Sequence, residues 1–196
     1  MTKVGDFAAI FLGACLINNL ILDTMVGLPP AVATSKKIAT AVNMAITMTL
    51  VLMIATVATY PLYYYVLLPL DLVYLQTISF VFLTALGIKT AEACLKRFKP
   101  ELYQRVAVFI PLTLINSAVL GVALVNMQSQ HGVIGSVFFG LGAAIGFGLV
   151  IIAMAAMQER MMAAEIPTPF RGIAILLITL GIMSMAFMGF NGIASL

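Results

Sequence analysis

Long segments without a single charged residue dominate this chain. They lie at 38–70, 106–130, 132–158 and 172–196, with shorter ones at 7–22 and 72–88. A membrane-spanning helix needs about 20 predominantly apolar residues. The chain is 63% hydrophobic and 9% charged, against about 25% charged in soluble domains, so it lacks the polar surface of a soluble globule. The sequence therefore predicts an all-α integral membrane protein.

The apolar segments can be divided at their proline, tyrosine and polar residues into spans of membrane length. We expect six transmembrane helices, at about 7–28, 38–59, 70–92, 105–127, 133–157 and 172–193. The longest polar stretch, Gln158 to Gly172, is only a loop, and no linker or soluble domain is visible. Residues 1–196 are therefore predicted to form a single membrane domain.

Basic residues gather in alternate loops. They are Lys36 and Lys37 in the first loop, Lys96, Arg97, Lys99 and Arg105 in the third, and Arg160 and Arg171 in the fifth. By the positive-inside rule these loops are predicted to be cytoplasmic, with both termini outside. The net charge of +3 thus reflects topology. It does not indicate nucleic-acid binding, because the basic residues are not interleaved with aromatic ones.

A near-identical heptapeptide occurs twice, as LINNLIL at 16–22 and LINSAVL at 114–120, an offset of 98 residues. We expect the halves, about 1–98 and 99–196, to be related copies. Three helices is an odd number, so the second half would enter the membrane upside down relative to the first. The predicted fold is therefore two inverted three-helix repeats.

The repeated segment carries polar side chains in the middle of two spans: Asn18, Asn19, Asn116 and Ser117. An unsatisfied polar group is costly there, and asparagine competes for backbone hydrogen bonds. We expect helices 1 and 4 to be interrupted at these residues, and the two breaks to meet near the pseudo-twofold axis. The alternative is that the side chains only link continuous helices by hydrogen bonds.

Asp23 lies one turn beyond Asn19. An ionisable group at this depth indicates a functional site, and we group it with the four polar residues above as a candidate midplane pathway for electrons or ions. The alternative is that Pro29 and Pro30 end the helix early and Asp23 reaches interfacial water.

Three further features have structural interpretations. Asp71 follows Pro69 and is expected to cap the third helix, and Lys89 and Glu92 are expected to pair at i, i+3. The glycine-rich segment 140–146 has the wrong spacing for a phosphate loop and is typical of close helix packing. The single histidine, His131, has no nearby ligand partners, and no set of catalytic residues is visible, so catalysis by this chain alone is not expected.

Several motifs resemble the A subunit of the bacterial Rnf complex and, more distantly, the E subunit of the sodium-pumping NADH:quinone oxidoreductase. They span nearly the whole chain: Asn18-Asn19, Ser35-Lys36-Lys37, PLDLVYL at 69–75, GVAL at 121–124, GLGAAIGF at 140–147, PTPFRG at 167–172 and AFMGF at 186–190. The resemblance implies a bacterial inner-membrane complex that exchanges electrons between NAD(H) and ferredoxin or flavodoxin while moving Na⁺ or H⁺.

The resemblance also implies partners and a cofactor. The A and E subunits are related, inverted partners, accompanied by flavin- and iron-sulfur-carrying subunits within the lipid bilayer. Their interrupted helices are expected to hold a two-iron, two-sulfur cluster at the midplane, with two cysteines from each chain.

This sequence departs from that pattern at both cysteine positions. Pro29 stands at the first, after Gly27-Leu28, and Ser117 at the second, while Cys15 and Cys94 lie elsewhere. Proline offers no donor atom, and a serine oxygen is a harder ligand than the thiolates that hold such clusters. We therefore expect no metal ligand from this chain and an abandoned cluster site.

Two other functions compete with a membrane subunit of an Rnf-type complex. One is a stand-alone channel or secondary transporter built from the same inverted repeat, which the polar midplane and the missing redox ligands favour. The other is a purely structural subunit.

Overall fold

The computed structural model describes residues 4–34, 37–98, 100–114, 116–128 and 132–192, and these contain helices and turns without any strand. The α-helices are α1 (Val4–Leu12), α2 (Leu20–Thr24), α3 (Leu28–Thr34), α4 (Ile38–Leu62), α5 (Gln76–Phe98), α6 (Pro100–Val106), α7 (Ile110–Leu114), α8 (Ser117–Gln128), α9 (Val133–Met162) and α10 (Ile173–Met188). The shorter turns are π-helical at Gly13–Ile17 and Tyr63–Leu67 and 3₁₀-helical at Val73–Leu75, Thr168–Phe170 and Gly189–Gly192.

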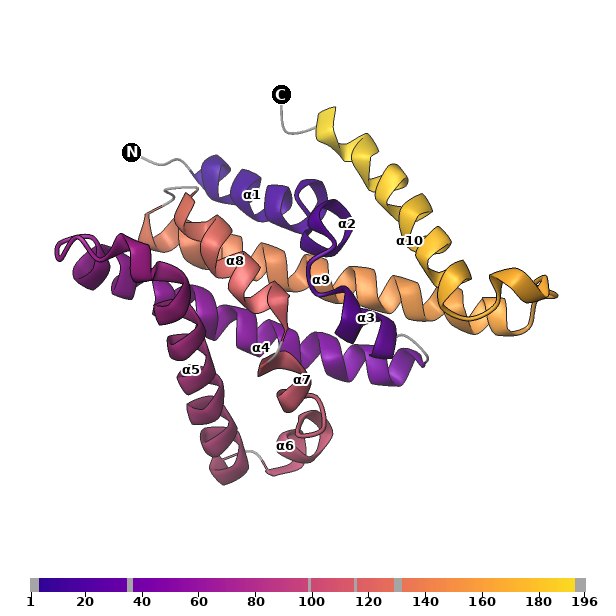
Figure 1. Ribbon diagram of the computed structural model, residues 1–196, viewed down its shortest axis with the longest axis horizontal. Coiled ribbons are helices and arrows are strands. Elements are labelled where there is room, and N and C mark those ends of the chain that lie inside the picture. The colour runs from indigo at the N-terminus through magenta and orange to yellow at the C-terminus, as the bar shows by residue number, and fades with distance from the viewer. Residues whose placement is uncertain (1–3, 35–36, 99, 115, 129–131, 193–196) are drawn as a thin grey trace.

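The two longest helices, α4 and α9, lie side by side at the centre of the molecule (Figure 1). Met48 and Leu52 of α4 and Phe147 and Ile151 of α9 are completely buried. Glycines of α9 allow close approach to its neighbours: a Cβ at Gly148 would lie 3.1 Å from the Cβ of Ala45 on α4, and a Cβ at Gly142 or Gly146 would lie 2.5 Å from a backbone carbonyl oxygen of the first helix. The prediction that the glycine-rich segment packs helices is confirmed.

In the part of the chain that the structure describes, six apolar helices lie close to the six predicted spans. Three are long enough to cross a bilayer: Ile38–Leu67, Val73–Arg97 and Val133–Met162. Three are shorter: Asp6–Ile17, Ser117–Gln128 and Ile173–Met188. Two of the short ones are the helices that were predicted to be interrupted. The all-α membrane fold is therefore confirmed at this level.

Helices α5 and α10 project from opposite sides of the central pair (Figure 1). Both expose apolar side chains, including Ile78 and Phe82 on α5 and Ile173 and Met185 on α10. Such faces suit contact with lipid tails or with apolar surfaces of neighbouring proteins.

Two helices run past their predicted ends. Helix α4 passes through Pro61 and continues as a π-helical turn to Leu67, beyond the predicted end at 59. Pro61 removes one hydrogen bond of the helix without ending it. Helix α9 likewise runs to Met162, beyond the predicted end at 157.

The prediction that Asp71 caps the third helix is wrong. Asp71 lies in a turn with φ of 54°, two residues before the 3₁₀ turn at Val73–Leu75 that leads into α5. The turn begins at Leu72 with no side-chain cap. A left-handed residue reverses the chain here, and aspartate tolerates that conformation better than most residues.

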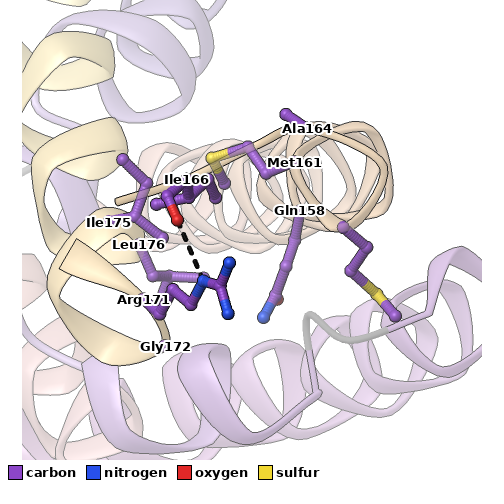
Figure 2. A pocket seen from close by; sticks show the side chains of 9 residues that line it. Gln158, Met161, Ala164, Ile166, Arg171, Gly172, Ile175 and Leu176 are labelled. Atoms are coloured by element: carbon purple, nitrogen blue, oxygen red, sulfur yellow. Dashed lines mark hydrogen bonds between the residues drawn. The ribbon is translucent and has the colours of Figure 1, made fainter. Parts of the chain in front are cut away.

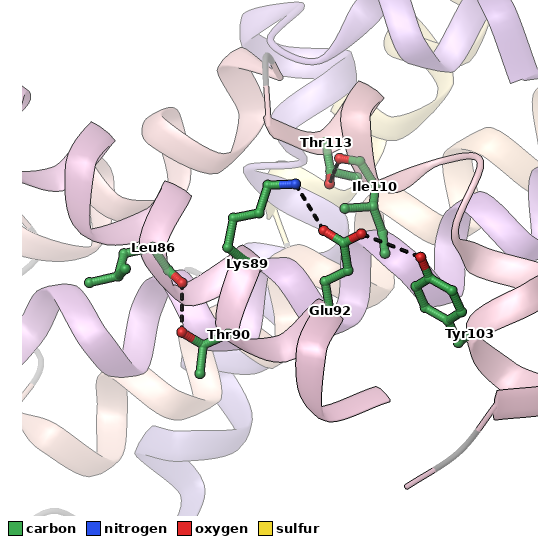
Figure 3. A network of polar contacts seen from close by, with 7 residues as sticks. All are labelled: Leu86, Lys89, Thr90, Glu92, Tyr103, Ile110 and Thr113. Carbon is green, nitrogen blue, oxygen red and sulfur yellow. Dashed lines mark hydrogen bonds and ion pairs between the residues drawn. The ribbon is translucent and has the colours of Figure 1, made fainter. Parts of the chain in front are cut away.

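Polar contacts tie together the ends of helices that carry the basic loops. The backbone N–H of Ile38 donates to Glu159 Oε1 at 2.9 Å, which joins the start of α4 to the end of α9. Lys89 and Glu92 form the predicted ion pair at 2.9 Å, and the Tyr103 hydroxyl donates to Glu92 at 3.4 Å (Figure 3). His131 and the side chain of Cys94 lie outside the described part of the chain.

Candidate functional site

The first helix of the bundle is broken at the predicted asparagines. Helix α1 passes into the π-helical turn, which closes where the Asn18 N–H donates to the Gly13 carbonyl at 2.8 Å. Asn19 then takes an extended conformation and begins α2. Its Oδ1 accepts from the Ile21 N–H at 3.2 Å, and its Nδ2 donates to the Cys15 carbonyl at 2.9 Å. One buried side chain thus satisfies backbone groups on both sides of the break.

A second break of the same kind separates α7 from α8. Asn116 Oδ1 accepts from the Ala118 N–H at 3.0 Å, two residues further along, as Asn19 does in the first half. Asn116 Nδ2 approaches the sulfur of Met48 at 3.3 Å, which links the break to the central helix α4. The two breaks therefore share an asparagine cap.

The structural match between the breaks is one residue out of register with the sequence match. The heptapeptide alignment pairs Asn18 with Asn116, whereas the shared cap pairs Asn19 with Asn116. The π-helical turn before Asn18 explains the shift, because it inserts one extra residue into the first broken helix. Asn19 and Asn116 are both buried, but Asn18 is exposed.

A hydrogen bond between Gly27 and Ser117 connects the chain that follows the first break to the second break. The Gly27 N–H donates to the Ser117 Oγ at 3.2 Å. Gly27 has φ of 84°, and a Cβ there would lie 2.7 Å from the ring of Phe147 and 2.9 Å from the Cβ of Ala118. Only glycine fits this conformation and this close approach.

Asn18 and Asp23 are exposed and line a cavity beside the first break. They help line a cavity of about 420 Å³ between α1, α2, α8 and α9, together with Thr24, Val125 and Phe139. Asp23 also lines a second cavity, of about 190 Å³, beside Ser184 and Phe187 of the C-terminal part. Asp23 is thus an exposed carboxyl at the edge of two cavities.

The structure divides the predicted site residues into two groups. Asn19, Asn116 and Ser117 hold the breaks together by hydrogen bonds, whereas Asn18 and Asp23 line cavities. Pro29 and Pro30 do not end the first helix, because α2 ends at Thr24 and both prolines lie in the first turn of α3. Proline is well tolerated there, where its missing N–H would have no partner.

Comparison with known proteins identifies the family. Residues 7–194 match the model of a membrane protein, the Rnf-Nqr subunit. The chain belongs to the Rnf-Nqr family.

Similar proteins in this family include three that are named as the A subunit of an ion-translocating oxidoreductase complex. That of Pseudoalteromonas translucida is 43% identical over 96% of this chain and 97% of its own length. The subunit of Vibrio campbellii is 44% identical over 96% of this chain and 98% of its own length. The subunit of Salmonella arizonae is 42% identical over 97% of this chain and 99% of its own length.

The cluster expected from the Rnf resemblance does not fit the residues at its two positions here. Pro29 is exposed and lies two residues from Gly27, so both positions adjoin the Gly27–Ser117 bond. The proline ring has no donor atom, and the Ser117 oxygen accepts the Gly27 N–H. Neither side chain supplies the thiolate that such clusters require. Over the described residues, no three His, Cys, Asp or Glu side chains gather as a metal site would need.

Two polar residues that the sequence analysis did not single out are buried without hydrogen-bond partners. They are Asn126 of α8 and Ser136 of α9, which are 1% and 2% exposed. Asn126 directly follows Val125, and Ser136 lies three residues before Phe139. Both Val125 and Phe139 line the larger cavity. Their signal in the sequence is a polar side chain near the end of an apolar span, which is also common at the membrane interface.

Proposed function

We propose that this chain is a membrane subunit of an Rnf-type complex, which couples electron transfer between NAD(H) and ferredoxin or flavodoxin to translocation of Na⁺ or H⁺. The observation that carries the proposal is similarity of more than 40% identity over nearly the full length of proteins named as the A subunit of an ion-translocating oxidoreductase complex. The partners proposed from the resemblance are the related E subunit, as an inverted counterpart, and subunits that carry flavin and iron-sulfur groups.

We also propose six spans arranged as two inverted three-helix repeats. In support, each half contains a broken segment (α1 to α3, and α6 to α8), a long central helix (α4 or α9) and an outer helix (α5 or α10). The matching asparagine caps of the two broken segments add a shared local geometry to this order.

The proposed orientation is a bacterial inner-membrane protein with both termini in the periplasm. The bond between Ile38 and Glu159 supports it, because it brings Lys37, which precedes α4, to the same end of the bundle as Arg160 in the last turn of α9. Basic loops on one side of the membrane are those that remain in the cytoplasm.

Within the complex we assign ion handling, rather than ligation of a redox centre, to this chain. The proposed pathway residues are Asn18 and Asp23, whose amide and carboxyl groups both line a cavity beside a broken helix. Oxygen donors of this kind suit Na⁺, and a carboxyl can equally accept a proton. Asn19, Asn116 and Ser117 position this segment through the hydrogen bonds at the two breaks.

Purification of the tagged chain from its native host in mild detergent tests the assignment to a complex. We expect flavin- and iron-sulfur-containing subunits to copurify and the preparation to oxidise NADH. An untagged strain carried through the same procedure is the control. A chain that purifies alone, and that moves ions when reconstituted alone, would instead be a stand-alone channel or transporter.

A further inference from the structure

A pocket lies between the end of α9 and the start of α10, away from the helix breaks. Its volume is about 420 Å³, which is within the range of small-molecule sites. One part of its wall is apolar, with Met161, Ile175 and Leu176, and another part carries the polar groups of Gln158 and Arg171 (Figure 2). Such a divided wall suits a ligand that has both an apolar part and a charged part.

Arg171 is held in place by its own loop. Its Nε donates to the Ile166 carbonyl at 2.9 Å (Figure 2). This bond uses one of the five N–H groups of the guanidinium and leaves the two terminal nitrogens to face a ligand. Arg171 is also the charged member of the set of residues that line the pocket, so the pocket favours an anion.

The surroundings of the pocket indicate where the ligand comes from. Beyond Gly172, α10 exposes Ile173 and Leu177 on a helix apolar enough to contact lipid tails. Arg160 lies in the last turn of α9 and Arg171 in the loop that follows, so the proposed orientation puts the pocket at the cytoplasmic surface of the membrane. Basic pockets between helices on this side bind anionic lipid headgroups.

We infer that this pocket binds an anionic phospholipid, with the headgroup phosphate on Arg171 and the start of an acyl chain against Met161, Ile175 and Leu176. Free inorganic phosphate would meet the same guanidinium but would leave the apolar wall uncovered. The flexible methionines at the end of α9 adapt to an irregular chain. This inference does not depend on the proposed ion pathway, because it concerns different residues at the opposite end of α10 from Ser184.

Lipid retention by the purified assembly tests the inference. The protein, with whatever subunits copurify, is placed in nanodiscs of mixed phosphatidylglycerol and phosphatidylcholine, and tightly bound lipid is counted by native mass spectrometry after delipidation. Arg171→Gln is expected to lower the retained phosphatidylglycerol about fivefold, the effect of one basic residue at a membrane surface. Arg160→Gln is the matched control, because Arg160 is exposed in the last turn of α9 and does not line the pocket.

Two further measurements make the test decisive. Ile175→Trp fills the apolar side and keeps Arg171, so it should also release the lipid, and it replaces Arg171→Gln if that variant does not fold. Equal retention by Arg171→Gln, Ile175→Trp and the parent would overturn the inference. So would displacement of phosphatidylglycerol by excess inorganic phosphate, since the site would then recognise phosphate without its lipid tails.

Discussion

The Gly27 N–H and the Ser117 hydroxyl meet at 3.2 Å although 90 residues separate them in the chain. The bond joins the segment that follows one asparagine-capped break to the first residue of the helix that follows the other. It therefore links the two interrupted helices directly, in addition to their packing against α4 and α9. Loss of this hydrogen bond should therefore destabilise the structure around both breaks.

Replacing Ser117 with alanine should destabilise the protein by about 0.5–1.5 kcal/mol, the net value of one hydrogen bond, with more if Gly27 is left unsatisfied. Ser136→Ala is the matched control, because Ser136 also lies in a helix of the bundle but its hydroxyl has no partner. Its removal should be neutral or stabilising. Thermal unfolding of both variants in one detergent measures the difference, and equal effects would mean that the Gly27 bond contributes nothing.

Gly27→Ala should be more damaging than Gly172→Ala. Both glycines have φ of 84°, a conformation that strains alanine at each position. Only at Gly27 would the new Cβ clash, at 2.7 Å from the Phe147 ring, since nothing lies within 4 Å of the corresponding position at Gly172. Yield of folded protein and melting temperature compare the two. A larger loss for Gly172→Ala would contradict the close approach at Gly27.

Asp23→Asn should reduce ion transport per electron transferred by about tenfold or more, if a charged carboxyl contributes at least about 1.4 kcal/mol to ion binding. The amide keeps the shape of the side chain but cannot carry the charge. Asp71→Asn serves as the control, since Asp71 is exposed in a turn at φ of 54° that asparagine also tolerates. Transport is measured in proteoliposomes of the complex. Unchanged transport by Asp23→Asn would remove Asp23 from the pathway.

The helix breaks could be predicted from the sequence, and their details could not. Asparagine in the middle of an apolar span needs hydrogen-bond partners, and capping a broken helix provides them, so both breaks lie where the repeat placed them. The register was wrong by one residue because a π-helical turn leaves no pattern in an apolar segment such as Gly13–Ile17.

The roles of residues that depend on tertiary contacts could not be predicted from local sequence patterns. Nothing in the sequence distinguishes Gly27 from the other fourteen glycines, because its contacts with Phe147 and Ser117 form only in the folded protein. The pocket at Arg171 likewise requires the end of α9 and the start of α10 to be folded together. Pro61 and Asp71 show the opposite error, because a local rule was applied where the bundle overrides it.

The topology predicted from the charged loops is open to a direct test. Reporter domains fused after Lys37, Lys99 and Arg160 should report the cytoplasm, and one fused after Leu196 should report the periplasm. The reason is the concentration of Lys and Arg in alternate loops, which resist translocation. A cytoplasmic C-terminus would refute the proposed orientation.

The last prediction concerns the two positions where the Rnf resemblance implies cysteine ligands. If this chain gives no ligand to a cluster, Pro29→Ala and Ser117→Ala should leave the iron content per assembled complex unchanged. Pro29 has no donor atom to lose, and the Ser117 oxygen accepts the Gly27 N–H. A serine that bound iron would also have to lose its proton where a low dielectric penalises the charge.

Iron is measured by elemental analysis and by the visible and electron paramagnetic resonance spectra of the complex, normalised to the protein that assembles. Ser136→Ala accounts for any general effect of removing a hydroxyl from the bundle. Because the Ser117→Ala variant also loses its bond to Gly27, a Gly27→Ala variant, which disturbs the same contact but keeps the Ser117 hydroxyl, separates loss of packing from loss of a ligand. Iron lost with Ser117→Ala and retained with Gly27→Ala would show that Ser117 holds a metal centre, and that the cluster site has been modified rather than abandoned.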